Sequence, residues 1–290
     1  MNGTSWDLVL TIAEGWQWHV ALKVSKRLNL PLVTIFHDWW PEVVELPSFA
    51  QRLFEKRIHD LAAASKLIFC VSEGMKARLG NKAKSVVLYP IPNQLSVPKK
   101  PIRFQSKHFT LAYAGMLNSI FATSLHSLSK FIAGESSLEL RLFGGQPEWE
   151  TPFYRGFVTR SQLEDELSQA DALLVVVSFD LRRRVWAETS FPSKLVEYCC
   201  FGRPIILWTP EYSAAAVWAK THGAAMVVSQ AEPEAVLEAI ARLKGDPQQQ
   251  QEFGQKARHM AETLFHPDRI QEQFVQGLER VVGEWRGQHG

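Results

Sequence analysis

The residues whose types and spacing best suit chemistry lie in one predicted helix between Pro192 and Gly202. Ser193 and Lys194 fall in its first turn, where free N–H groups and the positive end of the helix dipole favour an anion. Glu197 comes three residues after Lys194, so it projects from about the same side. A phosphate there would meet N–H groups, a hydroxyl and an ammonium. A carboxylate one turn deeper would accept hydrogen bonds from the vicinal hydroxyls of a ribose.

Spacing alone leaves two interpretations open. A surface Lys–Glu pair on an ordinary helix, worth about 0.2–0.5 kcal/mol, is the simpler one. The neighbouring residues favour a donor site, because the run from Pro192 to Tyr198 and the segment 201–206 resemble the donor-site signature of GT-B glycosyltransferases, in particular family 4. The resemblance implies that Glu197 holds the ribose of a nucleotide-sugar donor. It also implies that Ser193 and Lys194 face the diphosphate.

The same resemblance assigns further site residues. Gly115 matches the glycine after the first strand of the second domain, where the backbone approaches phosphate closely. Gly144, and Phe157 with Val158, match the segments that flank the nucleobase. His37 ends a strand and matches the catalytic-side histidine that faces the donor sugar, where it would hold a sugar hydroxyl or assist proton transfer. Ordinary turn glycines and an ordinary loop histidine are the alternatives.

The basic residues that would bind the diphosphate differ from the family pattern. The family usually carries an Arg and a Lys downstream of the glycine matching Gly115, and the segment 116–121 has neither. Arg183, with arginine neighbours at 182 and 184, would supply that charge. A solvated basic loop fits these arginines equally well.

Two other departures concern register and length. The paired acidic motif of the family has seven residues between its two Glu positions, whereas Glu188 and Glu197 have eight between them. The opening strands of the family have no counterpart before Asp7. Either the protein is longer, or its first domain is reduced and leaves a sheet edge exposed.

Alternating strands and helices predict an α/β fold with parallel sheets. With the resemblance, we expect a GT-B-like fold of two doubly wound, Rossmann-like domains facing a cleft, the first of them incomplete. The polar, proline-containing stretch 93–107 is the best linker. The predicted parts are a partial acceptor-side domain over 1–94, a nucleotide-sugar-binding domain over 95–265 and a terminal helix over 266–290. An apolar stripe would let that helix cross back to the first domain.

Two helices carry more local signals. The helix predicted over 15–28 has Val20, Val24 and Leu28 at four-residue spacing, the period of an apolar helix face. A second helix has Ser161 as its predicted N-cap, with a glutamate three positions later as in a capping box.

The composition of the chain argues against several classes of protein. A net charge of +2 over 290 residues does not indicate nucleic-acid binding. Three cysteines in apolar runs give no disulfide framework and fit reduced core thiols. No run approaches the ~20 apolar residues of a membrane span, and the N-terminus lacks the basic region of a secretory signal. We therefore expect a cytoplasmic protein, with contact at the inner membrane surface left open.

The resulting hypothesis is a retaining, hexosyltransferase-like enzyme of polysaccharide or glycoconjugate biosynthesis. It would move a sugar from a nucleotide-sugar donor to a hydroxyl of a glycan, lipid-linked or small-molecule acceptor. No HExxH, CxxC or acidic cluster indicates a metal, and we expect no cofactor. A nucleotide-sugar epimerase and a non-catalytic binding or scaffold protein remain alternatives. A nicotinamide oxidoreductase is disfavoured, because no GxGxxG follows the first strand.

Overall fold

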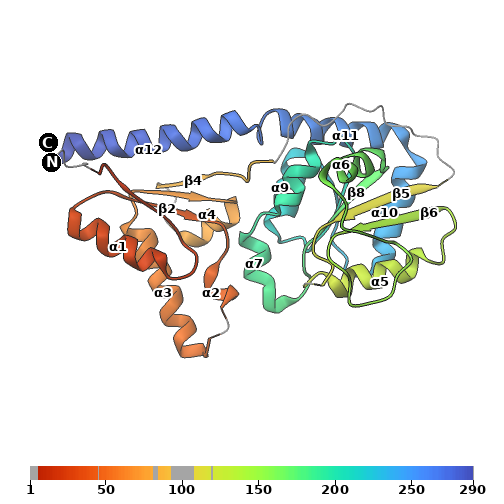
Figure 1. Cartoon of the computed structure of the whole chain (residues 1–290), viewed down its shortest axis with the longest axis horizontal. Helices are drawn as coiled ribbons and strands as arrows, with labels where there is room; N and C mark the ends of the chain where they lie inside the picture. The colour runs from red at the N-terminus through yellow and green to blue at the C-terminus, as the bar shows by residue number, and fades with distance from the viewer. Residues whose placement is uncertain (1–5, 45, 81–83, 93–107, 119, 290) are drawn as a thin grey trace. The chain divides into compact units, whose positions relative to one another are not determined.

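Short apolar runs form two all-parallel sheets, with helices between most successive strands (Figure 1). The computed structural model describes residues 6–44, 46–80, 84–92, 108–118 and 120–289, so the predicted linker 93–107 lies outside the described residues. The chain divides into a first unit of residues 1–90, 182–191 and 267–290, and a second unit of residues 91–181 and 192–266. The predicted α/β class with two parallel sheets is confirmed.

The first unit contains a four-stranded sheet in the order β1-β2-β3-β4. Its strands are β1 (Val9–Ile12), β2 (Leu32–Phe36), β3 (Leu67–Cys70) and β4 (Ser85–Val87). Its helices are α1 (Gln17–Leu28), α2 (Trp40–Val43), α3 (Ser48–Ala64), α4 (Glu73–Leu79), α7 (Arg184–Thr189) and α12 (Pro267–His289). Each strand pairs in parallel with the next, which requires a crossover between them.

Both faces of this sheet are covered, which explains its nearly unbroken apolar strands. Alternate side chains point to opposite faces, so Leu32 and Ile68 pack in one cluster with residues of α1, α3 and α4. Val33 and Phe69 pack on the other face against Val281 and neighbouring apolar residues of α12. The predicted apolar stripe of the terminal helix therefore packs on the sheet of the first unit.

The apolar stripe expected on α1 does not face the core. Val20 and Leu28 are 64% and 53% exposed, and α1 instead buries Trp18. The four-residue spacing thus marks an exposed apolar face of α1, and other positions form the side that packs on the sheet. Strand β1, beside it, lies at the edge of the sheet order, and its Leu10 and Ile12 are each 42% exposed. An apolar surface thus follows the edge strand and its helix.

Segment 182–191 lies between β8 and α8 in the sequence but packs within the first unit. The Trp186 indole N–H and the Ser190 hydroxyl both donate to Asp38 Oδ1, at 3.1 and 2.6 Å. The Trp186 backbone N–H donates to Glu42 Oε2 at 3.1 Å, and burial raises the pKa of Glu42. The division predicted from sequence places this segment in the second domain instead.

The second unit contains a six-stranded sheet in the order β10-β9-β8-β5-β6-β7. Its strands are β5 (Phe109–Ala114), β6 (Leu138–Phe143), β7 (Tyr154–Gly156), β8 (Ala172–Val176), β9 (Ile205–Trp208) and β10 (Met226–Val228). Its helices are α5 (Ala122–Ile132), α6 (Arg160–Gln169), α8 (Ser193–Cys199), α9 (Ala214–His222), α10 (Pro233–Gly245) and α11 (Pro247–Glu262). Successive strands run outward from β5 on one side and from β8 on the other, so the strand order reverses between them.

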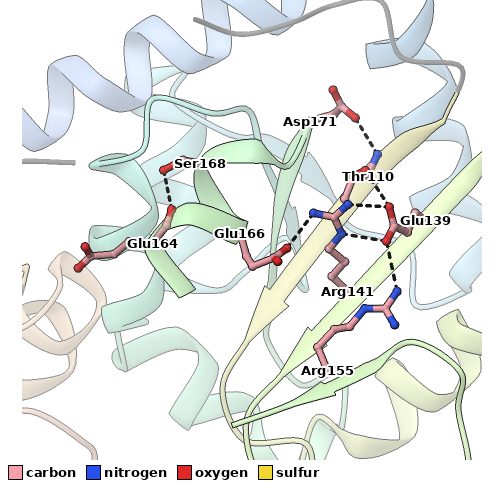
Figure 2. A network of polar contacts seen from close by, with 8 residues as sticks. All are labelled: Thr110, Glu139, Arg141, Arg155, Glu164, Glu166, Ser168 and Asp171. Carbon is pink, nitrogen blue, oxygen red and sulfur yellow. Dashed lines mark hydrogen bonds and ion pairs between the residues drawn. The ribbon is translucent and has the colours of Figure 1, made fainter. Parts of the chain in front are cut away.

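A polar network joins β5 and β6 to neighbouring elements (Figure 2). Arg141 on β6 contacts Glu139 on the same strand and Glu166 on α6, each at 2.8 Å. The guanidinium of Arg141 is the first cause that lowers the pKa of Glu139. Asp171, just before β8, accepts a hydrogen bond from the Thr110 backbone N–H at 2.7 Å. These contacts tie α6 to β6, and the start of β8 to the start of β5.

Helix α6 corrects one sequence prediction. Its N-cap is Thr159, with Gln162 completing a capping box, rather than Ser161 with the glutamate three positions later. Both pairs share the Ser/Thr-x-x-Glu/Gln pattern, and the helix begins two residues earlier than the pattern at Ser161 indicates. The unit otherwise keeps the predicted strand–helix order.

Candidate donor-nucleotide site

Three strand ends and one helix start line a single pocket in the second unit. Strands β5, β6 and β7 are neighbours and parallel, so their carboxyl ends lie along one edge of the sheet. Open α/β sheets place ligands at this edge, at the point where the strand order reverses. The pocket has a volume of about 580 Å3 and is lined by Ala114, Gly115, Met116, Asn118, Phe143, Gly144, Gly145, Gly156, Phe157, Val158, Leu163, Ser193, Lys194 and Glu197.

The glycine turns after β5 and β6 pack backbone against backbone. Gly115 and Gly144 have φ angles of 151° and 136°, a region of backbone conformation that residues other than glycine rarely adopt. A Cβ on Gly144 would overlap the Gly115 carbonyl, and a Cβ on Gly115 would overlap the Lys194 ammonium. The Gly115 N–H donates to the Phe143 carbonyl at 2.9 Å, which holds the two turns together. Conformation therefore requires glycine at both positions, and at Gly144 the contact with backbone atoms requires it as well.

Lys194 carries its positive charge into a largely apolar corner of the pocket. Its Nζ donates to the Tyr113 hydroxyl at 3.0 Å and lies 4.5 Å from the centre of the Tyr113 ring. Burial lowers the pKa of Lys194 to about 8, and the charge of Glu197 partly opposes that shift. Among the described residues that line the pocket, Lys194 is the only one with a cationic side chain. It is therefore the natural counter-ion for an anionic ligand.

Seven of the eight donor-binding residues predicted from sequence line this pocket. They are Gly115, Gly144, Phe157, Val158, Ser193, Lys194 and Glu197. Phe157 is 83% exposed, so its ring is open to a planar group such as a nucleobase. The arrangement offers an open aromatic ring, a carboxylate and an ammonium around one cavity, which matches the base, ribose and phosphate of a nucleotide.

The other two predicted site residues belong to the first unit. His37 Nδ1 lies 3.8 Å from Glu14 Oε1, and both side chains are nearly half exposed. Arg183 lies in the segment that packs with the first unit and is absent from the pocket lining. Its neighbour Arg184 forms an ion pair with Glu188 at 2.7 Å. The pocket itself is built from second-unit residues alone.

Sequence reasoning missed Tyr113, which lies beneath the pocket. It sits in β5 two positions before the glycine turn and is 1% exposed. A tyrosine in an apolar strand is typical of a core position, so the residue type did not indicate a role at the pocket. The signal that could have found it is the chemistry of its partner, because a buried lysine needs an acceptor.

The described part of the chain contains neither a metal-binding cluster nor a helix that could span a bilayer. No group of three or more His, Cys, Asp or Glu side chains there could hold a metal ion. Within those same residues, every helix is too short or too polar to span a bilayer.

No protein-family model and no curated protein matches this sequence, but its fold matches solved structures. HepE from Anabaena, solved in complex with UDP, aligns with a TM-score of 0.70 at 15% identity over 93% of this chain. TarM aligns at 0.66 with 12% identity, and the GtfA/B complex at 0.64 with 18%. The chain has the GT-B fold. It spans 78% of the HepE chain and 55% of each of the other two.

Proposed function

We propose that this protein is a GT-B glycosyltransferase of the family 4 type, which transfers a sugar from a nucleotide-sugar donor to an acceptor hydroxyl. The observation that carries the proposal is the pocket of the second unit, because seven predicted donor-binding residues from four separate segments line one cavity. The parallel topology alone brings the glycine turns to one edge of the sheet, but it does not require an ammonium, a carboxylate and an open aromatic ring around the same cavity. The UDP held by HepE supports a uridine donor as the first to test.

Each residue of the pocket has a proposed role. Glu197 accepts hydrogen bonds from the ribose hydroxyls, and Phe157 with Val158 flanks the base. Ser193 and Lys194 bind the diphosphate, and the Gly115 turn lets the backbone approach it. The ammonium of Lys194 would stabilise the negative charge that develops on the leaving diphosphate, in an environment where such charges interact strongly. This electrostatic route needs no metal, and the absence of a metal stays a prediction.

The finer parts of the proposal rest on the family resemblance. His37 is proposed as the first-unit residue that handles the sugar, and Arg183 as a further source of positive charge. Retention of configuration, a hexosyl donor and a glycan, lipid-linked or small-molecule acceptor are proposed on the same ground. A cytoplasmic location and peripheral contact with the inner membrane surface are also predictions of this kind.

Thermal unfolding with UDP, GDP, ADP and dTDP tests the proposal. A ligand at about 100 times its dissociation constant should raise the free energy of unfolding by about 2.7 kcal/mol. That increase corresponds to a shift of several degrees. We expect a shift with one diphosphate that Glu197→Ala abolishes, while Glu234→Ala, on the exposed surface of α10, keeps it. No shift with any diphosphate would favour the scaffold alternative.

Product analysis separates transfer from epimerisation. The donor identified by the unfolding assay is incubated with and without a panel of sugar and lipid-linked acceptors, and the products are identified by NMR. A glycosyltransferase forms a new glycosidic bond only when acceptor is present. An epimerase changes the sugar of the donor without any acceptor.

A further inference from the structure

The diphosphate end of the pocket is short of positive charge. The turn after β5, with Gly115, Met116 and Asn118 in the pocket lining, contributes no cation. Lys194 arrives from α8 instead, and its head group occupies the space beside Gly115. A lysine has a long, flexible side chain, and fixing its ammonium at one point costs conformational entropy. Ligand binding bears this cost unless other groups already hold the ammonium in the free protein.

We propose that Tyr113 is a positioning residue for the diphosphate, whose buried hydroxyl fixes the Lys194 ammonium against the Gly115–Met116 turn. This inference rests on the proposed function and deepens it. It implies that a lysine from a different element, held by a tyrosine of β5, takes the place of the basic residues missing after Gly115. Tyr113 itself would not touch the ligand.

The hydroxyl of Tyr113 joins the cation to the turn. It accepts a hydrogen bond from Lys194 Nζ at 3.0 Å and donates one to the Met116 carbonyl at 3.1 Å. Burial raises the pKa of Tyr113, so the phenol keeps its proton at neutral pH and makes both bonds at once. One buried atom thus sets the distance between the lysine head group and the backbone that faces the pocket.

The surroundings of the ammonium leave it little freedom. The Tyr113 ring lies 4.5 Å from Nζ and the Phe121 ring 5.9 Å away, at cation–π range. On another side the backbone of Gly115 is so close that a methyl group there would overlap Nζ. Glu197, one turn along α8, is the acidic group that acts on Lys194. These contacts hold the ammonium in place before any ligand binds, unlike that of a mobile surface lysine.

Affinity measurements on a double-mutant cycle test the inference. The dissociation constants of UDP and of uridine are measured by calorimetry or ligand-observed NMR for the wild type, Tyr113→Phe, Lys194→Met and the double variant. We expect Tyr113→Phe to weaken UDP binding about 3–10-fold, the range for one hydrogen bond, and Lys194→Met to weaken it about 10–100-fold. In the Lys194→Met background Tyr113→Phe should have no further effect, and uridine affinity should be unchanged throughout.

Tyr198→Phe is the matched control. Tyr198 is as buried as Tyr113, and its hydroxyl accepts a hydrogen bond from the Ala114 backbone N–H at 2.8 Å rather than from the lysine. Its effect on UDP affinity should be the same with and without Lys194. Phenylalanine keeps each ring in the core, so both variants retain the packing of the sheet.

Three results would overturn the inference. Tyr113→Phe could leave UDP affinity unchanged, could weaken UDP and uridine equally, or could have the same effect in both lysine backgrounds. A wild type that binds none of UDP, GDP, ADP and dTDP would overturn the proposed function, and this inference with it. A wild type that binds another of these diphosphates is tested with that diphosphate and its nucleoside.

Discussion

The charge of Lys194 lowers the stability of the free protein at the position where we propose that it binds the diphosphate. The folded protein holds its ammonium in a partly desolvated site, and the pKa near 8 means that the charged form is disfavoured relative to the unfolded chain. Stability of the free protein therefore increases as the pH rises through 8, where the unfolded chain binds more protons. An anionic ligand has the opposite preference, because it binds the protonated form.

Lys194→Met should stabilise the free protein and weaken its binding of the ligand. At pH 7 the isosteric apolar side chain removes a desolvated charge, and we expect the free energy of unfolding to increase by about 1–2 kcal/mol. Denaturant unfolding without ligand measures this change. A decrease in stability would show that the charge contributes to the fold instead.

UDP affinity should fall as the pH rises through about 8. The wild type loses the positive charge of Lys194 over this range, whereas the affinity of Lys194→Met should be flat there. Calorimetric titrations from about pH 6.5 to about pH 9.5 measure both profiles. Equal slopes in the two proteins would assign the titration to another group.

The residues that line the pocket could be predicted to lie together because their types are chemically distinctive and their order matches a signature. Lys194, Glu197 and the glycine turns belong to this group. Tyr113 could not be predicted, because its role depends on which side chain from another element reaches its hydroxyl. Such a pairing is fixed by the packing of α8 on the sheet and leaves no local pattern.

At the scale of elements, α12 packs closely on the sheet of the first unit. A Cβ on Gly277 would lie 2.7 Å from Cζ of Phe69 on β3, which is closer than real side chains approach. The apolar residues that flank this glycine on α12 pack on the same face of the sheet. The glycine thus sets the distance between the helix and the strand.

Gly277→Val should therefore destabilise the first unit by about 1–3 kcal/mol through overpacking. Gly283→Val is the matched control, because a Cβ on this second α12 glycine meets no atom within 4 Å. Thermal unfolding of the two variants measures the difference. Equal stability of the two would show that α12 does not pack on β3 in solution.

The network around Arg141 should give the second unit a pH-dependent stability. Arg141 lowers the pKa of Glu139, so the pair stabilises the fold above the ordinary pKa of a glutamate and loses this contribution as the pH falls through the lowered value (Figure 2). Glu139→Gln should cost about 1 kcal/mol at pH 7, and the cost should vanish as the pH falls through the lowered pKa of Glu139. Glu135→Gln, at an exposed position after α5, should show no such dependence.

Elements were predictable where their periodicity was simple. Strands such as β2 and β8 follow from continuous apolar runs, and α4 from its Ser72 cap, which accepts a hydrogen bond from the Met75 N–H. The orientation of α1 was not, because helical spacing shows that a face exists without showing what covers it. The packing of segment 182–191 depends on Asp38 and Glu42, more than 140 positions away.

At the scale of the whole molecule, the chain repeats one construction twice. Each unit is a parallel sheet with helices between its strands, and the alternation of apolar runs with helical segments made this predictable. The division of the chain was harder to predict, because three segments distant in sequence make up the first unit. The pocket that we propose as the donor-nucleotide site is lined by residues of the second unit only.

A crystal structure of the protein with UDP tests this proposal most directly. We expect UDP in the pocket at the carboxyl ends of β5, β6 and β7. Its ribose hydroxyls should lie within hydrogen-bond distance of Glu197, its diphosphate should contact Lys194 Nζ, and its base should lie against Phe157. UDP bound elsewhere, or an empty pocket at a concentration that saturates binding in solution, would contradict the proposed donor site.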